Sequence, residues 1–124
     1  MSAGYILVVE DDDALRELLE IVLTDEGYEV QVASSAAEAL NLARKRQPAL
    51  ILFDVLLGDQ HGAAFVESYR QLPDATAPMM AVSALADLAA EAARIGADDF
   101  LAKPFDLDDL LARLKRAIGG EPVE

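Results

Sequence analysis

Uninterrupted runs of apolar residues are the strongest pattern in this chain. Residues 5–9 and 49–53 are apolar throughout, which is typical of strands buried on both faces of a parallel sheet. Shorter apolar runs at 79–82 and 100–102 predict two more strands of the same kind. Residues 29–33 alternate polar and apolar side chains instead, and this pattern predicts a strand towards the edge of the sheet.

Between these strands, apolar residues recur with the spacing of an α-helix. After the first strand they occupy positions i, i+3, i+4 and i+7, which predicts a helix capped by Asp12 or Asp13 and ended by Gly27. Ser34 or Ser35 is expected to begin a second helix, and Glu38 lies at the right distance from Ser35 for a capping box. The remaining predicted helices span residues 63–72, 85–95 and 107–118, the last with Asp106 as its cap.

Strand and helix therefore alternate five times along the chain. Such alternation predicts an α/β fold, a five-stranded parallel sheet with helices on both faces. This is the doubly wound, flavodoxin-like arrangement. A chain of 124 residues has the size of one domain. We expect the domain to span residues 1–118, with residues 119–124 as a C-terminal tail or the start of a linker.

Composition and charge narrow the classes of function. The net charge of −13 argues against direct binding of nucleic acid or of an anionic membrane. No apolar run approaches the roughly 18 residues of a membrane span, and we expect no signal peptide before the first strand. The chain contains no cysteine, which excludes disulfides and thiolate metal sites and fits a cytoplasmic protein.

Chemically reactive residues stand at the ends of four of the five predicted strands. Glu10 and Asp11 follow the first, Asp54 ends the third, Ser83 ends the fourth, and Lys103 follows the fifth. Parallel strands present their carboxyl ends at one edge, where ligands bind. Converging carboxylates repel one another unless a hard cation such as Mg²⁺ or Mn²⁺ neutralises them. A hydroxyl and an ammonium suit phosphoryl oxygens, and carboxylates are known phosphoryl acceptors. The set predicts metal-dependent phosphoryl transfer onto an aspartate.

From Ile6 to about Ile118, the chain resembles the receiver domain of two-component response regulators. Each matching segment is weak alone, but the segments occur in the family's order and each lies at a strand end. They cover residues 7–12, 52–54, 83–84, 96–100 and 103–105.

The resemblance implies a phosphoacceptor and a metal site. Asp54 would take a phosphoryl group from a phosphohistidine of a histidine kinase or histidine phosphotransferase. Asp11 would bind Mg²⁺ directly and Glu10 through water. Asp54 and the backbone carbonyl of Leu56 would complete the protein ligands.

The resemblance also implies a relay to the surface. Lys103 would contact the phosphoryl oxygens, and its bond to Pro104 is usually cis in the family. Ser83 stands where the family has the Thr or Ser whose hydroxyl moves onto the phosphate. Phe100 stands at the switch aromatic, which turns inward when that hydroxyl moves. The family's usual proline after the acceptor is Gly58 here, which suggests a looser loop.

Simpler readings of several residues stay open. The acids at 10–13 also suit the start of a helix, and Phe100 also suits core packing. His61, the single histidine, is expected to be an exposed loop residue within a loop that ends at Gly62. Asp98 and Asp99 are expected to form a solvated turn.

Three functions are compatible with the sequence. The first is a phosphorylation-driven signalling switch, not an enzyme, that contributes to its own phosphorylation and dephosphorylation. The second is a receiver-fold scaffold that binds partners without phosphate. The third is a small Mg²⁺-dependent phosphatase, which usually needs an acid where this chain has Leu56. The downstream partner is an unknown protein or an output domain outside the sequence. The oligomeric state stays open, including a weak homodimer that uses Asp99 and Arg113.

Overall fold

In a computed structural model, which describes residues 4–57, 60–84 and 96–118, the chain forms a five-stranded parallel sheet in the order β2-β1-β3-β6-β7. The strands are β1 (Ile6–Val9), β2 (Val30–Ala33), β3 (Leu50–Asp54), β6 (Met79–Ser83) and β7 (Asp99–Ala102). The described helices are α1 (Asp13–Asp25), α2 (Ala36–Lys45), α3 (Gly62–Arg70) and α5 (Leu107–Ala117). The predicted fold class is therefore confirmed. The helix predicted at 85–95, Gly58 and the tail at 119–124 lie outside the described residues.

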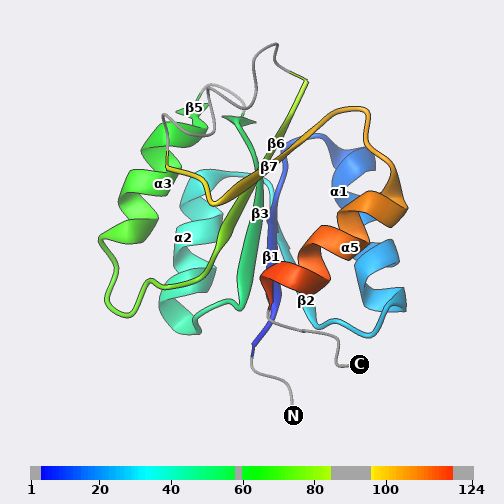
Figure 1. Cartoon of the computed structure of the whole chain (residues 1–124). Helices are drawn as coiled ribbons and strands as arrows, with labels where there is room; N and C mark the ends of the chain where they lie inside the picture. The colour runs from blue at the N-terminus through cyan, green and yellow to red at the C-terminus, as the bar shows by residue number, and fades with distance from the viewer. Residues whose placement is uncertain (1–3, 58–59, 85–95, 119–124) are drawn as a thin grey trace.

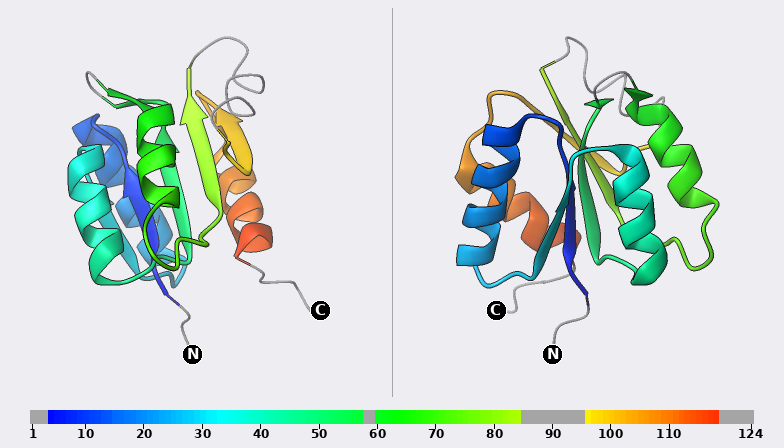
Figure 2. Two further views of the ribbon diagram at one scale, coloured as in Figure 1. Left: turned by 90° about the vertical axis from the view of Figure 1, so that its left-hand side faces the viewer. Right: turned by 180° about the vertical axis from the view of Figure 1, so that it is seen from behind.

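Helices cover both faces of the sheet. Figure 1 shows α2 and α3 on one side of the strands and α1 and α5 on the other, and the view from behind in Figure 2 agrees. Side chains alternate along β1, so Leu7 and Val9 pack towards α2 and α3, while Ile6 and Val8 pack towards α1 and α5. Two separate apolar cores result, one on each face of the sheet.

The burial of the strands follows their sequence patterns. Every residue of β1, β3 and β6 is buried, as the continuous apolar runs predict. In β2, which lies at the edge of the sheet, Ala33 alone is fully buried. The alternating pattern at residues 29–33 therefore marks an edge strand, as predicted.

The ends of the helices are set by short polar side chains. Asp12 caps α1 by accepting hydrogen bonds from the backbone N–H groups of Ala14 and Leu15, and Asp106 caps α5. Ser35 caps α2, but Glu38 accepts from Ser34, at 2.9 Å from the backbone N–H. The predicted bond from the Glu38 N–H to the Ser35 hydroxyl is present at 3.2 Å, and only the return bond of the capping box is shifted by one residue. In the described part of the chain, no helix has the length and hydropathy of a membrane span.

The segment after Asp54 is not the simple loop that the sequence suggested. β4 (Leu56–Leu57) pairs with β5 (Gln60–His61) in an antiparallel hairpin, and α3 begins directly afterwards at Gly62. A Cβ atom at Gly62 would lie 3.0 Å from the carbonyl oxygen of Val55, so glycine permits this close return of the chain. Two strands of two residues each are too short to leave a periodic pattern, which explains the wrong prediction.

Candidate functional site

The ends of four neighbouring strands bring the candidate residues to one edge of the sheet. Glu10 follows β1, Asp54 is the last residue of β3, Ser83 is the last of β6, and Lys103 follows β7. The Lys103 N–H donates to the carbonyl oxygen of Ser83 at 2.9 Å, which extends the pairing of β6 and β7 up to the site. The peptide bond between Lys103 and Pro104 is cis. The expected convergence of the strand ends is present.

Asp54 is held by the backbone on one side and by a lysine on the other. Its side chain is buried, and its Oδ1 accepts a hydrogen bond from the Leu56 N–H at 2.9 Å. Its Oδ2 lies 2.6 Å from the Nζ of Lys103. Both carboxylate oxygens therefore have hydrogen-bond partners, and these partners set the orientation of the group.

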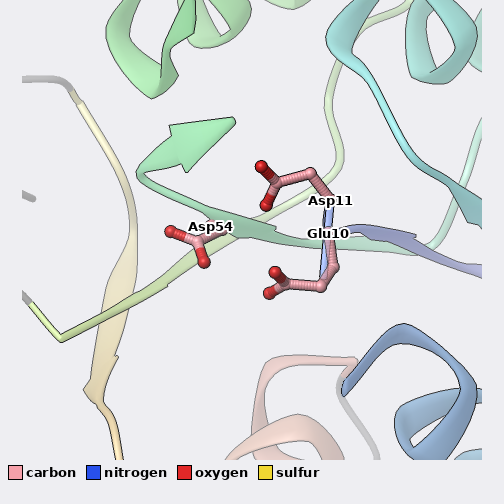
Figure 3. A group of neighbouring side chains, drawn as sticks. All are labelled: Glu10, Asp11 and Asp54. Carbon is pink, nitrogen blue, oxygen red and sulfur yellow. The ribbon is translucent and has the colours of Figure 1, made fainter. Parts of the chain in front are cut away.

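Three carboxyl groups meet around Asp54. One oxygen each of Glu10, Asp11 and Asp54 lies within 4.8 Å of the others, and Figure 3 shows the side chains directed towards a common space. Glu10 and Asp54 are buried, whereas Asp11 is exposed. Lys103 Nζ lies 3.4 Å from Glu10 Oε1 and 2.6 Å from Asp54 Oδ2, so one ammonium is shared by the two buried carboxyl groups. Full ionisation would therefore leave negative charge uncompensated within this cluster.

The site shifts the pKa values of Glu10 and Lys103. Burial raises the pKa of Glu10 to about 7; the Asp12 N–H opposes this effect, the charge of Asp54 adds to it, and Lys103 opposes it. Burial lowers the pKa of Lys103, but its bonds and charge interactions with Asp54 and Glu10 outweigh burial and raise the pKa above its ordinary value. Lys103 therefore stays charged, and Glu10 can take up a proton near neutral pH.

The donor atoms of this cluster fit a hard divalent cation. All three groups offer oxygen ligands, as Mg²⁺ and Mn²⁺ prefer, and Mg²⁺ needs only one or two carboxylates besides water. Asp11 is exposed, so an ion has access from solvent. The negative charge that Lys103 leaves uncompensated is what a divalent ion would neutralise.

Ser83 and Phe100 lie on adjacent strands, but their surroundings differ. Ser83 is buried and directly follows Val82, the residue that pairs with Asp54. Phe100 pairs with Ala81 in the middle of β7, and 37% of the residue is exposed. The reading of Phe100 as plain core packing is therefore wrong, because an aromatic ring in the core would be shielded from solvent.

The prediction of a solvated turn at Asp98 and Asp99 is confirmed for Asp98, which is exposed at a bend before β7, and wrong for Asp99. Asp98 Oδ2 accepts a hydrogen bond from the Met79 N–H at 2.8 Å and lies 3.2 Å from Arg70. Asp99 begins β7 and forms an ion pair with Arg113 at 2.9 Å. These acids bond β7 to its neighbours, and the pair considered for a dimer is made within one chain.

One residue beside the site was missed by sequence reasoning. Arg16 in α1 donates from Nη1 to the backbone carbonyl oxygen of Glu10 at 2.9 Å and also pairs with Asp13. Side chains of a helix point back towards its amino end. An arginine four residues after the Asp12 cap is therefore placed to reach the preceding loop, and this spacing was the available signal.

Comparison with known proteins identifies the family. The family model described as "Response regulator receiver domain" matches residues 6–115. The chain belongs to the response regulator receiver domain family. The receiver domain is 36% identical over 115 residues to the transcriptional regulatory protein KdpE of Mycobacterium tuberculosis, covering 91% of this chain and 50% of that protein.

Other relatives share the receiver domain in different settings. The DNA-binding transcriptional regulator NtrC of Proteus hauseri is 36% identical over 121 residues, which are 95% of this chain and 25% of NtrC. The chain spans about half the length of the first curated relatives it matches. The regulatory activities in the names of these relatives describe the whole relatives and not this chain.

Solved structures agree with the assignment. The crystal structure of a putative response regulator from Chloroflexus aurantiacus has a TM-score of 0.85 and 38% identity, covering 94% of this receiver domain and 98% of that chain. The chemotaxis protein CheY4 of Vibrio cholerae has a TM-score of 0.83 and 29% identity, with coverage of 94% and 99%. The doubly wound sheet is thus the fold of this family.

Proposed function

We propose that this receiver domain is a phosphorylation-activated signalling switch with Asp54 as its phosphoacceptor. A histidine kinase or histidine phosphotransferase would supply the phosphoryl group as a phosphohistidine. The observation that carries the proposal is the position of Asp54: a buried carboxylate at the end of the central strand, 2.6 Å from an ammonium and next to two further carboxyl groups.

The proposed transfer forms one bond and breaks one. A carboxylate oxygen of Asp54 forms a bond to phosphorus as the bond from phosphorus to the donor's imidazole nitrogen breaks. The electron pair of the broken bond stays on that nitrogen, and the other ring nitrogen keeps its proton. Lys103, which already bonds Asp54, would then hold the phosphoryl oxygens and offset their negative charge.

Four residues would hold the cation. Glu10, Asp11 and Asp54 offer carboxylate oxygens, and the family resemblance adds the backbone carbonyl of Leu56, whose N–H already bonds Asp54. A bound Mg²⁺ or Mn²⁺ supplies positive charge that stabilises phosphoryl oxygens.

The phosphorylated site would act on the surface through two residues. Ser83 is buried beside Asp54, and Phe100 is partly exposed on the next strand. Movement of the Ser83 hydroxyl onto the phosphoryl group would vacate space that the aromatic ring of Phe100 fills, because packed interiors favour discrete arrangements. Residues 1–118 form the switching domain in this proposal. An unidentified protein or output domain reads the altered surface.

Labelling with acetyl phosphate in the presence of Mg²⁺ tests the proposal. Intact mass spectrometry should show one phosphoryl group on the wild-type chain and none on Asp54→Asn. Asp13→Asn is the matched control, because Asp13 is a highly exposed acid outside the carboxyl cluster, and it should be labelled like wild type. Equal labelling of Asp54→Asn, or no labelling of wild type, would contradict the proposal; the second result favours a phosphate-independent scaffold.

A further inference from the structure

An arginine holds the loop between β1 and α1 from outside the carboxyl cluster. Arg16 Nη1 donates to the backbone carbonyl oxygen of Glu10 at 2.9 Å, and its Nη2 meets the carboxylate of Asp13. The side chain of Arg16 is 20% exposed, whereas that of Asp13 is 89% exposed. Exposed ion pairs contribute little to the stability of a folded protein. The sheltered bond to the Glu10 carbonyl is therefore the more significant of the two contacts.

The bonded carbonyl belongs to the peptide that joins Glu10 to Asp11. A peptide unit is planar, so holding its oxygen also sets the direction of the Asp11 N–H and of the chain between the two residues. Glu10 is bonded at other points as well: its N–H donates to the Ala33 carbonyl at 3.0 Å, and its Oε2 accepts from the Asp12 N–H at 3.1 Å. Arg16 adds a bond to the backbone from which both carboxyl groups project.

We propose that Arg16 is a positioning residue for the divalent cation. It acts by holding the Glu10–Asp11 peptide and touches neither the ion nor the phosphoryl group. This inference rests on the proposed function, because it assumes that Glu10, Asp11 and Asp54 bind the ion. Groups that orient the ligands of a metal change its affinity about 10–100-fold when they are removed.

Charge and position predict opposite results for the loss of Arg16. The guanidinium is a positive charge next to an acidic cluster, and removing it makes the local potential more negative, which alone would tighten cation binding. Loss of the bond to the Glu10 carbonyl would leave the two carboxyl groups less well directed and weaken binding. The sign of the change in affinity therefore distinguishes the two roles.

Mg²⁺ titrations of the whole chain, followed by the amide NMR signals of residues 10–12 and 54, provide the test. Arg16→Met keeps an unbranched apolar stem and should bind Mg²⁺ about tenfold more weakly than wild type. Arg16→Lys keeps the charge but lacks the planar fork, so it should recover only part of the affinity. Asp13→Asn removes only the exposed partner and should stay within about twofold of wild type.

Wild-type or tighter Mg²⁺ binding in Arg16→Met would overturn the proposal, as would a loss of metal-free stability with unchanged affinity. If Arg16→Met does not fold, Arg16→Lys decides, and wild-type affinity in that variant overturns the proposal. Asp11→Asn is titrated in parallel. Wild-type Mg²⁺ binding in Asp11→Asn would contradict the cation site itself. If Asp11→Asn loses Mg²⁺ binding and Arg16→Met keeps it in full, only the role of Arg16 is contradicted.

Discussion

The two edges of the sheet bury polar groups in opposite ways. At the amino edge the buried groups are neutral: the Tyr5 hydroxyl donates to the Arg46 carbonyl at 2.9 Å, and the Tyr69 hydroxyl donates to Gln47 at 2.9 Å and accepts from the Ala77 N–H at 3.0 Å. At the carboxyl edge the buried polar residues are Ser83 and two acids, Glu10 and Asp54, which share the ammonium of Lys103.

The difference shows where stability and function reside in the molecule. Burial raises the pKa of both tyrosines, so the hydroxyls at the amino edge stay neutral, and each donates to a fixed acceptor. Groups at the carboxyl edge carry charge that the fold only partly offsets, which is costly in the absence of a ligand. Substitutions at the amino edge should therefore lower stability, and substitutions at the carboxyl edge should alter binding and signalling.

The largest expected effect on stability is at the amino edge. Tyr69→Phe removes the acceptor of the buried Ala77 N–H and the donor to Gln47, and it should lower the free energy of unfolding by about 2 kcal/mol. Urea denaturation measures this change. Tyr28→Phe is the control: among the described residues the Tyr28 hydroxyl has no hydrogen-bond partner, so a change within about 0.5 kcal/mol is expected. Equal losses in both variants would contradict the role given to Tyr69.

The second effect is a pH dependence at the carboxyl edge. The pKa of Glu10 rises from an ordinary value near 4.5 to about 7 in the folded chain. The folded state then binds the proton more tightly, so the stabilisation is complete below pH 4.5 and is lost as the pH rises through 7. In EDTA, the free energy of unfolding of wild type should fall by on the order of 1 kcal/mol more than that of Glu10→Gln between pH 5 and pH 8. Parallel pH profiles of the two proteins would show that Glu10 does not carry this shift.

The smallest expected effect on the free energy of unfolding is that of Ser83→Ala, which tests the coupling between the site and the surface. Ser83→Ala should still accept a phosphoryl group at Asp54 but should no longer alter the surface around Phe100. In the complex with Mg²⁺ and beryllofluoride, a phosphoryl mimic, NMR of wild type should show changes at residues 99–101 and 107–111. The same changes in Ser83→Ala would show that the hydroxyl is not the relay and that coupling runs through the segment after Asp54.

Long apolar runs carried most of the prediction of the fold. The strands β1, β3 and β6 are buried along their whole length, and burial on both faces leaves a continuous apolar pattern that is readable from sequence. The hairpin of β4 and β5 was missed, because its strands have two residues each. The hairpin begins where the Leu56 N–H donates to the Asp54 carboxylate. A single hydrogen bond of this kind leaves no periodic pattern in the sequence.

The candidate site was predictable as a set of strand ends but not as a set of contacts. The positions of Asp54 and Lys103 at the ends of parallel strands implied that their side chains meet. The structure places Lys103 Nζ 2.6 Å from Asp54 Oδ2. The bonds of Asp98 and Arg16 were not foreseen, because each joins a side chain to backbone groups of another element. Such bonds depend on how the helices and strands pack against each other.

One measurement tests most directly whether the two edges are separate in function. The free energy of unfolding is compared in EDTA and with Mg²⁺ plus beryllofluoride, for wild type, Tyr69→Phe and Asp54→Asn. A ligand that binds only the folded chain stabilises it by about 1 kcal/mol at five times its Kd. We predict the same gain for wild type and Tyr69→Phe, although the latter starts from a lower stability, and no such gain for Asp54→Asn. An equal gain in Asp54→Asn would contradict the account, because the phosphoryl mimic would then bind elsewhere.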